Sequence, residues 1–277
     1  MRGKLIIGNW KLNGSKRLVG ELLDELDREL KQGVPDGLRL AVCPPSIYIS
    51  DLVSMAEVRG AELIVGCQHI SSYTQGSYTG ELSARMIKDA GCQICLVGHS
   101  ERRTLFREDD SSCRDKMSLL LDEGITPVLC IGETLEQKQV GATNLVLRAQ
   151  LEQSLSGLGL CQERKIHIAY EPVYAIGTGH AVSPDQAQHI HSDIRQILSQ
   201  IVGKELAEQI SILYGGSVTR DNALSLVACP DVDGLLIGGA SLSPEHFRTI
   251  CKKIFSLAKV LSYPGPLPGF ENYLDAV

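Results

Sequence analysis

Short apolar runs alternate with amphipathic stretches along almost the whole chain. The apolar runs are four to six residues long and rich in Ile, Leu and Val, which is typical of strands buried on both faces. Eight strands are predicted in this way: Leu5–Gly8, Leu38–Cys43, Leu63–Cys67, Ile94–Val97, Thr126–Ile131, Ile166–Tyr170, Ile210–Tyr214 and Gly234–Ile237.

The stretches between these runs have the apolar spacing of helices with one buried face. Leucines at 18, 22, 23, 26 and 30 recur every three or four residues, for example. The predicted helices are Lys16–Leu30, Ile47–Ala56, Ser83–Asp89, Cys113–Glu123, Asn144–Leu155, Pro184–Val202, Asn222–Val227 and Pro244–Ala258. Because parallel neighbours need crossover connections, eight strand–helix units predict an α/β protein with parallel strands.

Eight such units fit either a closed (β/α)8 barrel or an open doubly wound sheet. The positions of unusual polar residues favour the barrel. Asn9 and Lys11 follow the first strand, His99 and Glu101 the fourth, and Glu171 the sixth, so all lie at C-terminal strand ends. A barrel gathers those ends around one mouth, whereas an open sheet spreads them along a wide edge.

Composition and net charge limit the domain organisation, the partners and the location that the protein can have. A chain of 277 residues that is 43% hydrophobic can form one large core, and we expect a single barrel domain over residues 1–261 with a Pro/Gly-rich tail over 262–277. The net charge of −6 argues against nucleic-acid and anionic-membrane partners. No run approaches the ~20 apolar residues of a membrane span, and the N-terminus leads into a strand rather than a signal peptide. We therefore expect a cytoplasmic protein.

The nine cysteines are scattered through strands and helices, which indicates buried thiols in a reducing compartment rather than a disulfide framework. Cys92 and Cys95 have the spacing of a redox pair. However, Cys95 lies within an apolar strand, which favours a small core residue. His189 and His191 are two apart on a predicted helix and do not share a face, so no metal site is predicted there.

The strongest chemical signal lies in residues 169–179. Glu171 follows the end of an apolar strand, which fixes its backbone and leaves its carboxylate facing open space, as a proton-transfer base requires. The next residues have the composition of a lid. Gly177 and Gly179 supply backbone freedom, and Ile176 can cover a small ligand.

Glycines at the ends of the last two strands predict an anion site. Gly215-Gly216-Ser217 and Gly238-Gly239 let main-chain N–H groups approach an oxyanion closely. A short helix starting at Gly239 would add its N-terminus to the site. Lys11, at the end of an apolar strand beside the chain's only Trp, would supply a fixed positive charge. Together these groups predict a phosphate-bearing ligand.

Four motifs, Gly8–Lys11, Val97–Arg103, Ala169–Gly179 and Tyr214–Val218, resemble in sequence and order those of the triosephosphate isomerases. The resemblance runs from about Lys4 to Leu257. It implies a TIM barrel that interconverts dihydroxyacetone phosphate and D-glyceraldehyde 3-phosphate through an enediol(ate), with no cofactor and no metal.

The resemblance also implies the role of each site residue. Glu171 is the base and a neutral His99 the electrophile at the carbonyl, a pairing for which triosephosphate isomerases are themselves the standard example. The polar segment that opens a helix after His99 also disfavours the imidazolium form. Lys11 stabilises phosphate and enediolate, and Asn9 is a neutral partner of the substrate oxygens. Glu101 either supports the site through Lys11 or forms a purely structural ion pair.

By the same resemblance, the phosphate contacts Gly177, Ser217, Gly238 and Gly239, and Tyr214 helps to hold the closed lid. The implied lid consists of Pro172, Val173, Tyr174, Ala175, Ile176, Gly177, Thr178, Gly179 and His180. Tyr174 and His180 stand at hinge positions where the family usually has Trp and Lys. We expect altered lid-opening kinetics with retained chemistry.

The partner implied by the resemblance is a second copy of the chain. The polar loop 71–80 after the third strand is too long for a minimal turn. In the implied homodimer it places Thr79 beside the active site of the other subunit, while Glu81 pairs with Arg102 in its own loop cluster.

Two other functions remain open at this stage. The same aldose–ketose chemistry on a tetrose phosphate would need a roomier pocket around Ile176 and Leu236. A phosphosugar-binding sensor without turnover would be favoured if Glu171, His99 or Lys11 were replaced, and all three are present.

Overall fold

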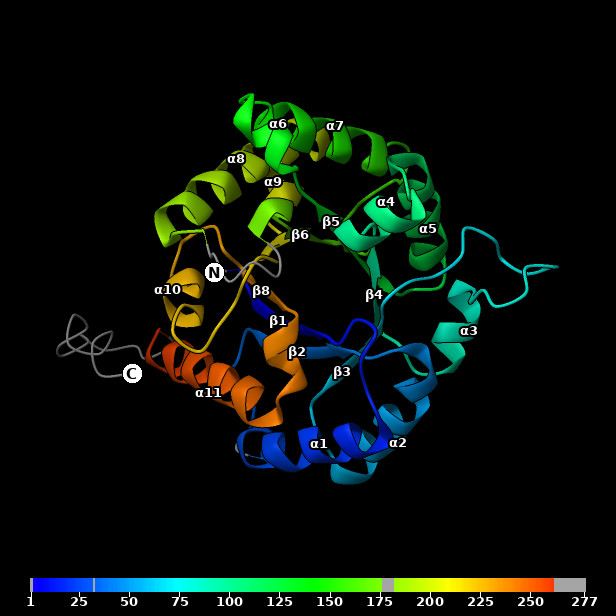
Figure 1. Ribbon diagram of the computed structural model, residues 1–277, viewed down its shortest axis with the longest axis vertical. Coiled ribbons are helices and arrows are strands. Elements are labelled where there is room, and N and C mark those ends of the chain that lie inside the picture. The colour runs from blue at the N-terminus through cyan, green and yellow to red at the C-terminus, as the bar shows by residue number, and fades with distance from the viewer. Residues whose placement is uncertain (1, 32, 176–181, 262–277) are drawn as a thin grey trace.

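The computed structural model describes residues 2–31, 33–175 and 182–261 (Figure 1). Eight parallel strands pair in chain order and β1 closes onto β8, so the predicted (β/α)8 barrel is confirmed. The strands are β1 (Lys4–Asn9), β2 (Leu38–Cys43), β3 (Ile64–Cys67), β4 (Ile94–Val97), β5 (Thr126–Ile131), β6 (His167–Tyr170), β7 (Ser211–Tyr214) and β8 (Gly234–Ile237). Each predicted strand agrees with the observed one to within one residue at either end.

Helices surround the barrel on its outside, as Figure 1 shows. They are α1 (Lys16–Lys31), α2 (Ile49–Arg59), α3 (Ala84–Asp89), α4 (Ser100–Phe106), α5 (Asp110–Asp122), α6 (Leu135–Gln139), α7 (Thr143–Leu155), α8 (Pro184–Val202), α9 (Lys204–Ala207), α10 (Ala223–Val227) and α11 (Pro244–Leu261), with 3₁₀ turns η1 (Ser46–Tyr48), η2 (Val173–Ala175) and η3 (Gly239–Leu242). The apolar spacing did not predict α6 and α9, and α4 was predicted only as a helix opening after His99, because none of these three segments buries a large apolar residue.

The core has two layers, and the strands separate them. Alternate strand residues such as Leu5, Ile7 and Leu213 fill the inside of the barrel. Their neighbours in sequence, such as Ile6 and Ile212, pack against the surrounding helices. Burial on both faces is the physical reason why each strand is an almost continuous apolar run.

The cysteines belong to this core. All nine lie in the described part of the chain as free thiols, and only Cys161 is exposed. Cys95 lies in β4 with none of its surface exposed, which confirms its interpretation as a core residue. Burial raises the pKa of the Cys92 thiol to about 12, so that side chain stays protonated and unreactive near neutral pH.

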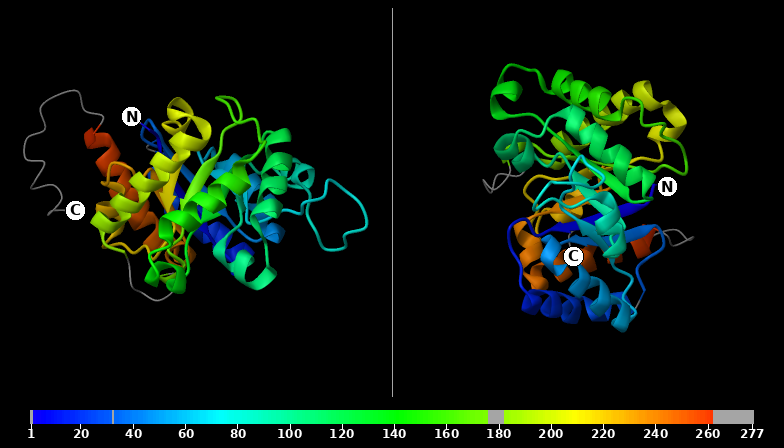
Figure 2. Two further views of the ribbon diagram at one scale, coloured as in Figure 1. Left: turned by 90° about the horizontal axis from the view of Figure 1, so that it is seen from above. Right: turned by 90° about the vertical axis from the view of Figure 1, so that its right-hand side faces the viewer.

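One long loop departs from the compact barrel. The segment between β3 and α3 extends outward, as the left view of Figure 2 shows in cyan. Near its tip Tyr73 and Tyr78 stack with ring centroids 3.8 Å apart, and both rings are largely exposed. Within residues 2–31, 33–175 and 182–261 the structure contains no helix of the length and apolar character that a membrane span requires.

The two histidines of α8 face opposite ways, as their spacing predicted. His189 is exposed, whereas His191 is fully buried with its ring edge-on to Tyr170 and Nδ1 3.2 Å from the carbonyl oxygen of Asp231. Burial lowers the pKa of His191 to about 4. The ring is therefore neutral in the folded protein and takes up a proton on unfolding below about pH 6.5.

We expect this histidine to make the fold less stable in acid. Because the folded-state pKa is lowered, the unfolded chain binds more protons between pH 6.5 and 4, and stability falls as the pH falls through that window. Relative to wild type, His191→Gln should lose about 2 kcal/mol less unfolding free energy between pH 7.5 and 5.0. Urea unfolding at both pH values measures this difference; equal losses in the two proteins would contradict it.

Candidate active site

The residues selected from the sequence meet at the C-terminal ends of the strands, around a cavity of about 350 Å³. The predicted residues in its walls are Asn9, Lys11, His99, Glu171, Ser217, Gly238 and Gly239. Glu101 lies outside the cavity wall and reaches it through Lys11. Gly177 and the other lid residues 176–180 lie outside the described residues.

Glu171 is held by two hydrogen bonds at the centre of this cavity. Its side chain follows β6 and is only 2% exposed. One carboxylate oxygen, Oε2, accepts from the main-chain N–H of Ser100 at 2.8 Å, and Oε1 lies 2.9 Å from His99 Nε2. Gly132 makes this arrangement possible, because a Cβ there would come 1.8 Å from the carbonyl oxygen of Glu171. The carboxylate is therefore fixed in a site with little water around it.

The partners of Glu171 keep it ionised despite its burial. Burial by itself raises the pKa of this carboxyl, but the hydrogen bonds from His99 and the Ser100 N–H and the charge of Lys11 act in the opposite direction. The net pKa lies below the ordinary value for glutamate. A carboxylate in this state can accept a proton across the whole neutral pH range.

The geometry favours a neutral ring at His99. Its Nδ1 accepts from the main-chain N–H of Glu101 at 3.2 Å, which leaves the single ring proton on Nε2. Burial lowers the pKa of His99, while the adjacent charge of Glu171 raises it, and the net shift is upward. The hydrogen bond that Nδ1 accepts can form only while this nitrogen carries no proton, so the geometry corresponds to a neutral ring.

Lys11 is placed by an unusual backbone turn after β1. It has a positive φ of 52°, rare for a residue other than glycine. The side-chain oxygen of Asn9 accepts from the Lys11 N–H at 3.0 Å, and Gln68 donates to the Lys11 carbonyl oxygen at 3.0 Å. Gln68 was not predicted as a supporting residue, because nothing in its local sequence shows that β3 lies beside this turn.

The ammonium group of Lys11 lies 2.6 Å from Oε1 of Glu101. The Glu101 side chain is 45% exposed, so solvent weakens the pair and the lysine keeps much of its attraction for an anion. The contact agrees with both interpretations of Glu101, as support for Lys11 and as a structural ion pair.

A main-chain cradle completes the wall of the same cavity. Gly216 and Ser217 follow β7, and Gly238 and Gly239 follow β8. Among the described residues the N–H groups of Gly216 and Ser217 have no acceptor, so they remain available to an anion. Gly216 also has to be small, because a Cβ there would come 2.3 Å from the Tyr214 hydroxyl oxygen.

The two ends of the lid are anchored differently. At the first end η2 contains Val173, Tyr174 and Ala175, and Lys138 Nζ lies 3.7 Å from the centre of the Tyr174 ring. At the second end the Tyr214 hydroxyl accepts from the Val182 N–H at 3.3 Å. His180, the other departure from the family pattern, lies outside the described residues.

The predicted pairing of Glu81 with Arg102 is wrong within the described chain. Arg102 donates to Glu108 at 2.7 Å, and Glu108, 6% exposed, also pairs with Lys116 at 2.9 Å. Glu81 instead lies 3.6 Å from His69. The buried carboxylate is the better partner for the guanidinium because less water competes for the charges. Thr79 lies exposed on the projecting loop.

The fold and site define a (β/α)8-barrel enzyme in which a buried carboxylate, an imidazole and a lysine face a main-chain anion cradle. Residues 4–254 match the family model described as Triosephosphate isomerase. The chain belongs to the triosephosphate isomerase family, and it is an isomerase that needs no cofactor.

The chain is similar to known triosephosphate isomerases over nearly their full lengths. The triosephosphate isomerase of Nitrosococcus oceani is 43% identical over 91% of this chain and 99% of its own, and that of Marinobacter nauticus is 44% identical over 91% and 98%. Among solved structures, triosephosphate isomerase from Bartonella henselae superposes with a TM-score of 0.80 at 35% identity, covering 91% of this chain and 98% of its own.

Proposed function

We propose that the protein interconverts dihydroxyacetone phosphate and D-glyceraldehyde 3-phosphate through an enediol(ate). The observation that carries this proposal is the meeting of Glu171, His99 and Lys11 in one cavity whose wall also contains Gly216 and Ser217, the N–H groups of which have no acceptor among the described residues. The first three groups suit proton transfer next to a carbonyl, and the N–H groups suit a phosphate.

In the proposed reaction Glu171 removes a proton from C1 of dihydroxyacetone phosphate. The C–H bonding electrons form the C1–C2 double bond, and the carbonyl electrons move onto the C2 oxygen. The Nε2–H of His99 donates to that oxygen and stabilises its charge. His99 then gives its Nε2 proton to the C2 oxygen and takes up the hydroxyl proton of the C1 oxygen. Glu171 returns its proton to C2, where the electrons of the C1–C2 double bond form the C–H bond, while the electrons on the C1 oxygen form the aldehyde carbonyl. To reach carbon, the carboxylate has to leave the Ser100 N–H that it contacts at 2.8 Å.

Lys11 and the cradle supply the electrostatic part of the mechanism. The lysine charge stabilises both the phosphate and the developing enediolate, and its fixed turn means that little reorganisation is needed during the reaction. Asn9 bonds to the N–H of Lys11 and faces the same cavity as a neutral hydrogen-bonding partner. The lid serves to exclude water, because an exposed phosphorylated enediolate loses phosphate readily.

A coupled assay with D-glyceraldehyde 3-phosphate and purified protein tests this function. We expect turnover without added metal or cofactor, with kcat/KM approaching about 10⁸ M⁻¹s⁻¹. Preference for a tetrose phosphate in the same assay would favour the larger sugar as substrate. Binding without turnover of either sugar would favour a sensor and contradict the proposal.

We also propose a homodimer formed by the projecting loop. The loop exposes the stacked rings of Tyr73 and Tyr78, which is costly in water unless another surface covers them. A separate cavity of about 460 Å³ next to the active site has exposed Leu12 and Phe106 in its walls. In a two-fold dimer each loop can enter the cavity of the other subunit, which brings Thr79 beside the other active site.

Dilution tests the dimer proposal. We expect specific activity to fall as the protein dissociates, because the turn that carries Lys11 borders the cavity that the loop would fill. Sedimentation and activity should therefore share one midpoint concentration. Tyr73→Ser should move both midpoints to higher concentration, with Tyr48→Ser, a change outside the loop, as comparison. A fully active monomer would contradict the proposal.

We propose a cytoplasmic location, and the buried free cysteines support it. Eight of the nine free thiols are buried in a core that is packed without cross-links. This use of cysteine as a small apolar residue is typical of proteins that fold in a reducing compartment.

A further inference from the structure

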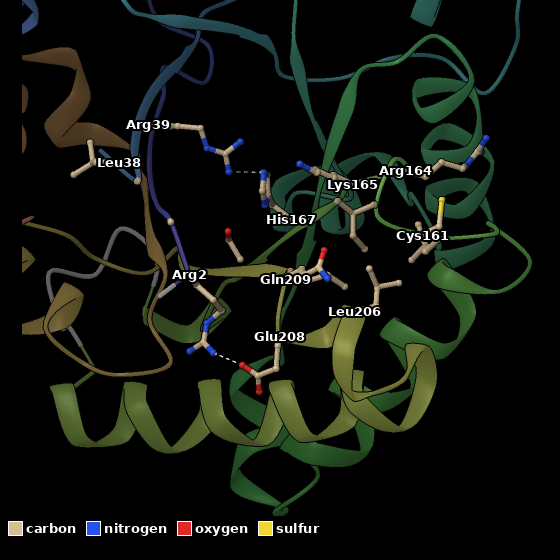
Figure 3. A pocket seen from close by; sticks show the side chains of 16 residues that line it. Arg2, Leu38, Arg39, Cys161, Arg164, Lys165, His167, Leu206, Glu208 and Gln209 are labelled. Atoms are coloured by element: carbon tan, nitrogen blue, oxygen red, sulfur yellow. Dashed lines mark hydrogen bonds and ion pairs between the residues drawn. The ribbon is translucent and has the colours of Figure 1, made fainter. Parts of the chain in front are cut away.

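A second cavity, of about 740 Å³, lies at the opposite end of the barrel from the active site (Figure 3). Its walls come from the residues that precede or begin β1, β2, β6 and β7. The packed barrel interior, which includes Ile7, Ala41 and Ala169, separates the two cavities. Neither the isomerase chemistry nor the lid uses any residue of this second cavity.

Two polar residues from opposite sides of the barrel meet in this cavity. Arg39 in β2 and His167 in β6 have the same strand alternation as the inward-facing Ala41 and Ala169, so both point into the barrel. Figure 3 shows them turned toward one another, with Arg39 Nη2 3.2 Å from His167 Nε2. In a barrel interior otherwise filled with apolar side chains, this end is polar and open.

The hydrogen bond fixes the state of the His167 ring. A guanidinium can only donate, so Nε2 accepts and the ring proton lies on Nδ1. Burial, together with the charges of Arg39 and Lys165, lowers the pKa of His167 to about 3, in agreement with a neutral ring. The residue is only 3% exposed, and its Nδ1 has no hydrogen-bond partner among the described residues. It is a buried donor that lacks an acceptor.

Positive charge in the cavity is also incompletely balanced. Arg39 and Lys165 contact no carboxylate in the part of the chain that the structure describes. Arg164 reaches the exposed Asp122 at 3.1 Å through Nη2, but its Nε is buried without a partner. The wall also contains the carboxylate of Glu208. Arg2 lies 2.6 Å from this carboxylate and neutralises its charge (Figure 3). Arg39 and Lys165 are exposed as residues, and the partial burial of the Arg39 guanidinium lowers its pKa with no carboxylate among the described residues to offset it.

We propose that this cavity binds a small polyanion bearing one or two phosphoryl groups, with Arg39 and Lys165 as its principal counter-charges. Guanidinium groups match the geometry of phosphate oxygens and bind them strongly. The volume lies within the range of ordinary small-molecule sites, about 300–1,000 Å³. Such a ligand supplies the negative charge that the described residues do not place beside Arg39 and Lys165.

Calorimetric titration with inorganic pyrophosphate tests the proposal. We expect two binding events per wild-type chain, one in the active site and one in the second cavity. Lys11→Met should remove or weaken the first, whereas Arg39→Gln and Lys165→Gln should each weaken the second by about tenfold or more. Arg114→Gln removes an equal charge from an exposed arginine that bonds Asp115, and should change neither event.

Further titrants identify the phosphate carrier. Binding of orthophosphate would show that one phosphoryl group suffices. A sugar bisphosphate tests whether a sugar increases the affinity, and ATP tests whether a nucleotide fits the cavity. Thermal unfolding and isomerase turnover of Arg39→Gln and Lys165→Gln are expected to match those of the wild type. This result would show that the loss of the second binding event is not caused by a loss of folding. Wild-type affinity for pyrophosphate in both variants, or an equal loss in Arg114→Gln, would overturn the proposal.

Discussion

Glu171→Gln is expected to lower kcat by about 10³–10⁴-fold and to change KM little. The amide retains the size of the side chain and an oxygen that can accept from the Ser100 N–H, which the carboxylate contacts at 2.8 Å. It cannot take a proton from carbon. Steady-state kinetics in both reaction directions measures the loss, and an unchanged midpoint of thermal unfolding shows that the fold is intact.

A matched variant separates the base from its surroundings. Glu101→Gln also removes a carboxylate next to His99, but this side chain is 45% exposed and contacts Lys11 and His99 from outside the cavity wall. We expect its effect on kcat to stay within about tenfold. If the two variants lose similar activity, Glu171 is not the base and the charge around His99 is what matters.

The pH profile gives an independent test of the base. The partners of Glu171 hold its pKa below the ordinary value, so activity attributable to this group should persist through the neutral range and fall only below about pH 4.3. Ser100→Pro removes the N–H donor, one of the groups that lowers the pKa, and should move the acid limb to higher pH. An acid limb that does not move would show that another group sets it.

Lys11→Met is expected to lower kcat/KM by about 10²–10³-fold, with part of the loss in KM. Lys11 is the only lysine or arginine in the described wall of the active-site cavity, so no neighbour can replace its charge. Methionine keeps most of the side-chain volume. The exposed Lys16→Met, which removes a lysine paired with Asp51 at 3.3 Å, is the matched control and should retain wild-type kinetics.

The double variant Lys11→Met with Glu101→Gln tests whether the activity loss of Lys11→Met comes from the unpaired charge of Glu101. In the single variant Glu101 loses its partner at 2.6 Å, and its free charge could repel the phosphate. If that repulsion causes the defect, the double variant recovers most of the activity. We expect no more than about tenfold recovery, because the missing positive charge acts directly on substrate and enediolate.

The sequence was sufficient to predict the fold and which polar residues meet around one cavity at the strand ends. Eight short apolar runs separated by one-sided helices leave few packing solutions, and parallel strands between helices are buried on both faces. Glu171, His99 and Lys11 each follow a strand, and barrel closure brings all C-terminal strand ends to one mouth. For such residues, position along the strand already determines position in space.

Other features were outside the reach of the sequence. Gln68, which follows β3, holds the Lys11 turn although β2 lies between β3 and β1. Arg102 pairs with Glu108 rather than Glu81 because Glu108 is buried beside it. These choices depend on burial and on side-chain direction. A pattern of residue types contains neither quantity, so it can identify charged groups without identifying their partners.

The sequence by itself therefore determined the barrel, the strand ends that carry chemistry and the family to which the chain is similar. The tertiary structure alone decided which polar groups are paired and which are left without partners. Arg39 and His167 are 128 positions apart and meet only because β2 and β6 close one barrel. Hydrophobic periodicity is local along the chain, whereas electrostatic pairing and desolvation depend on distances that exist only after folding.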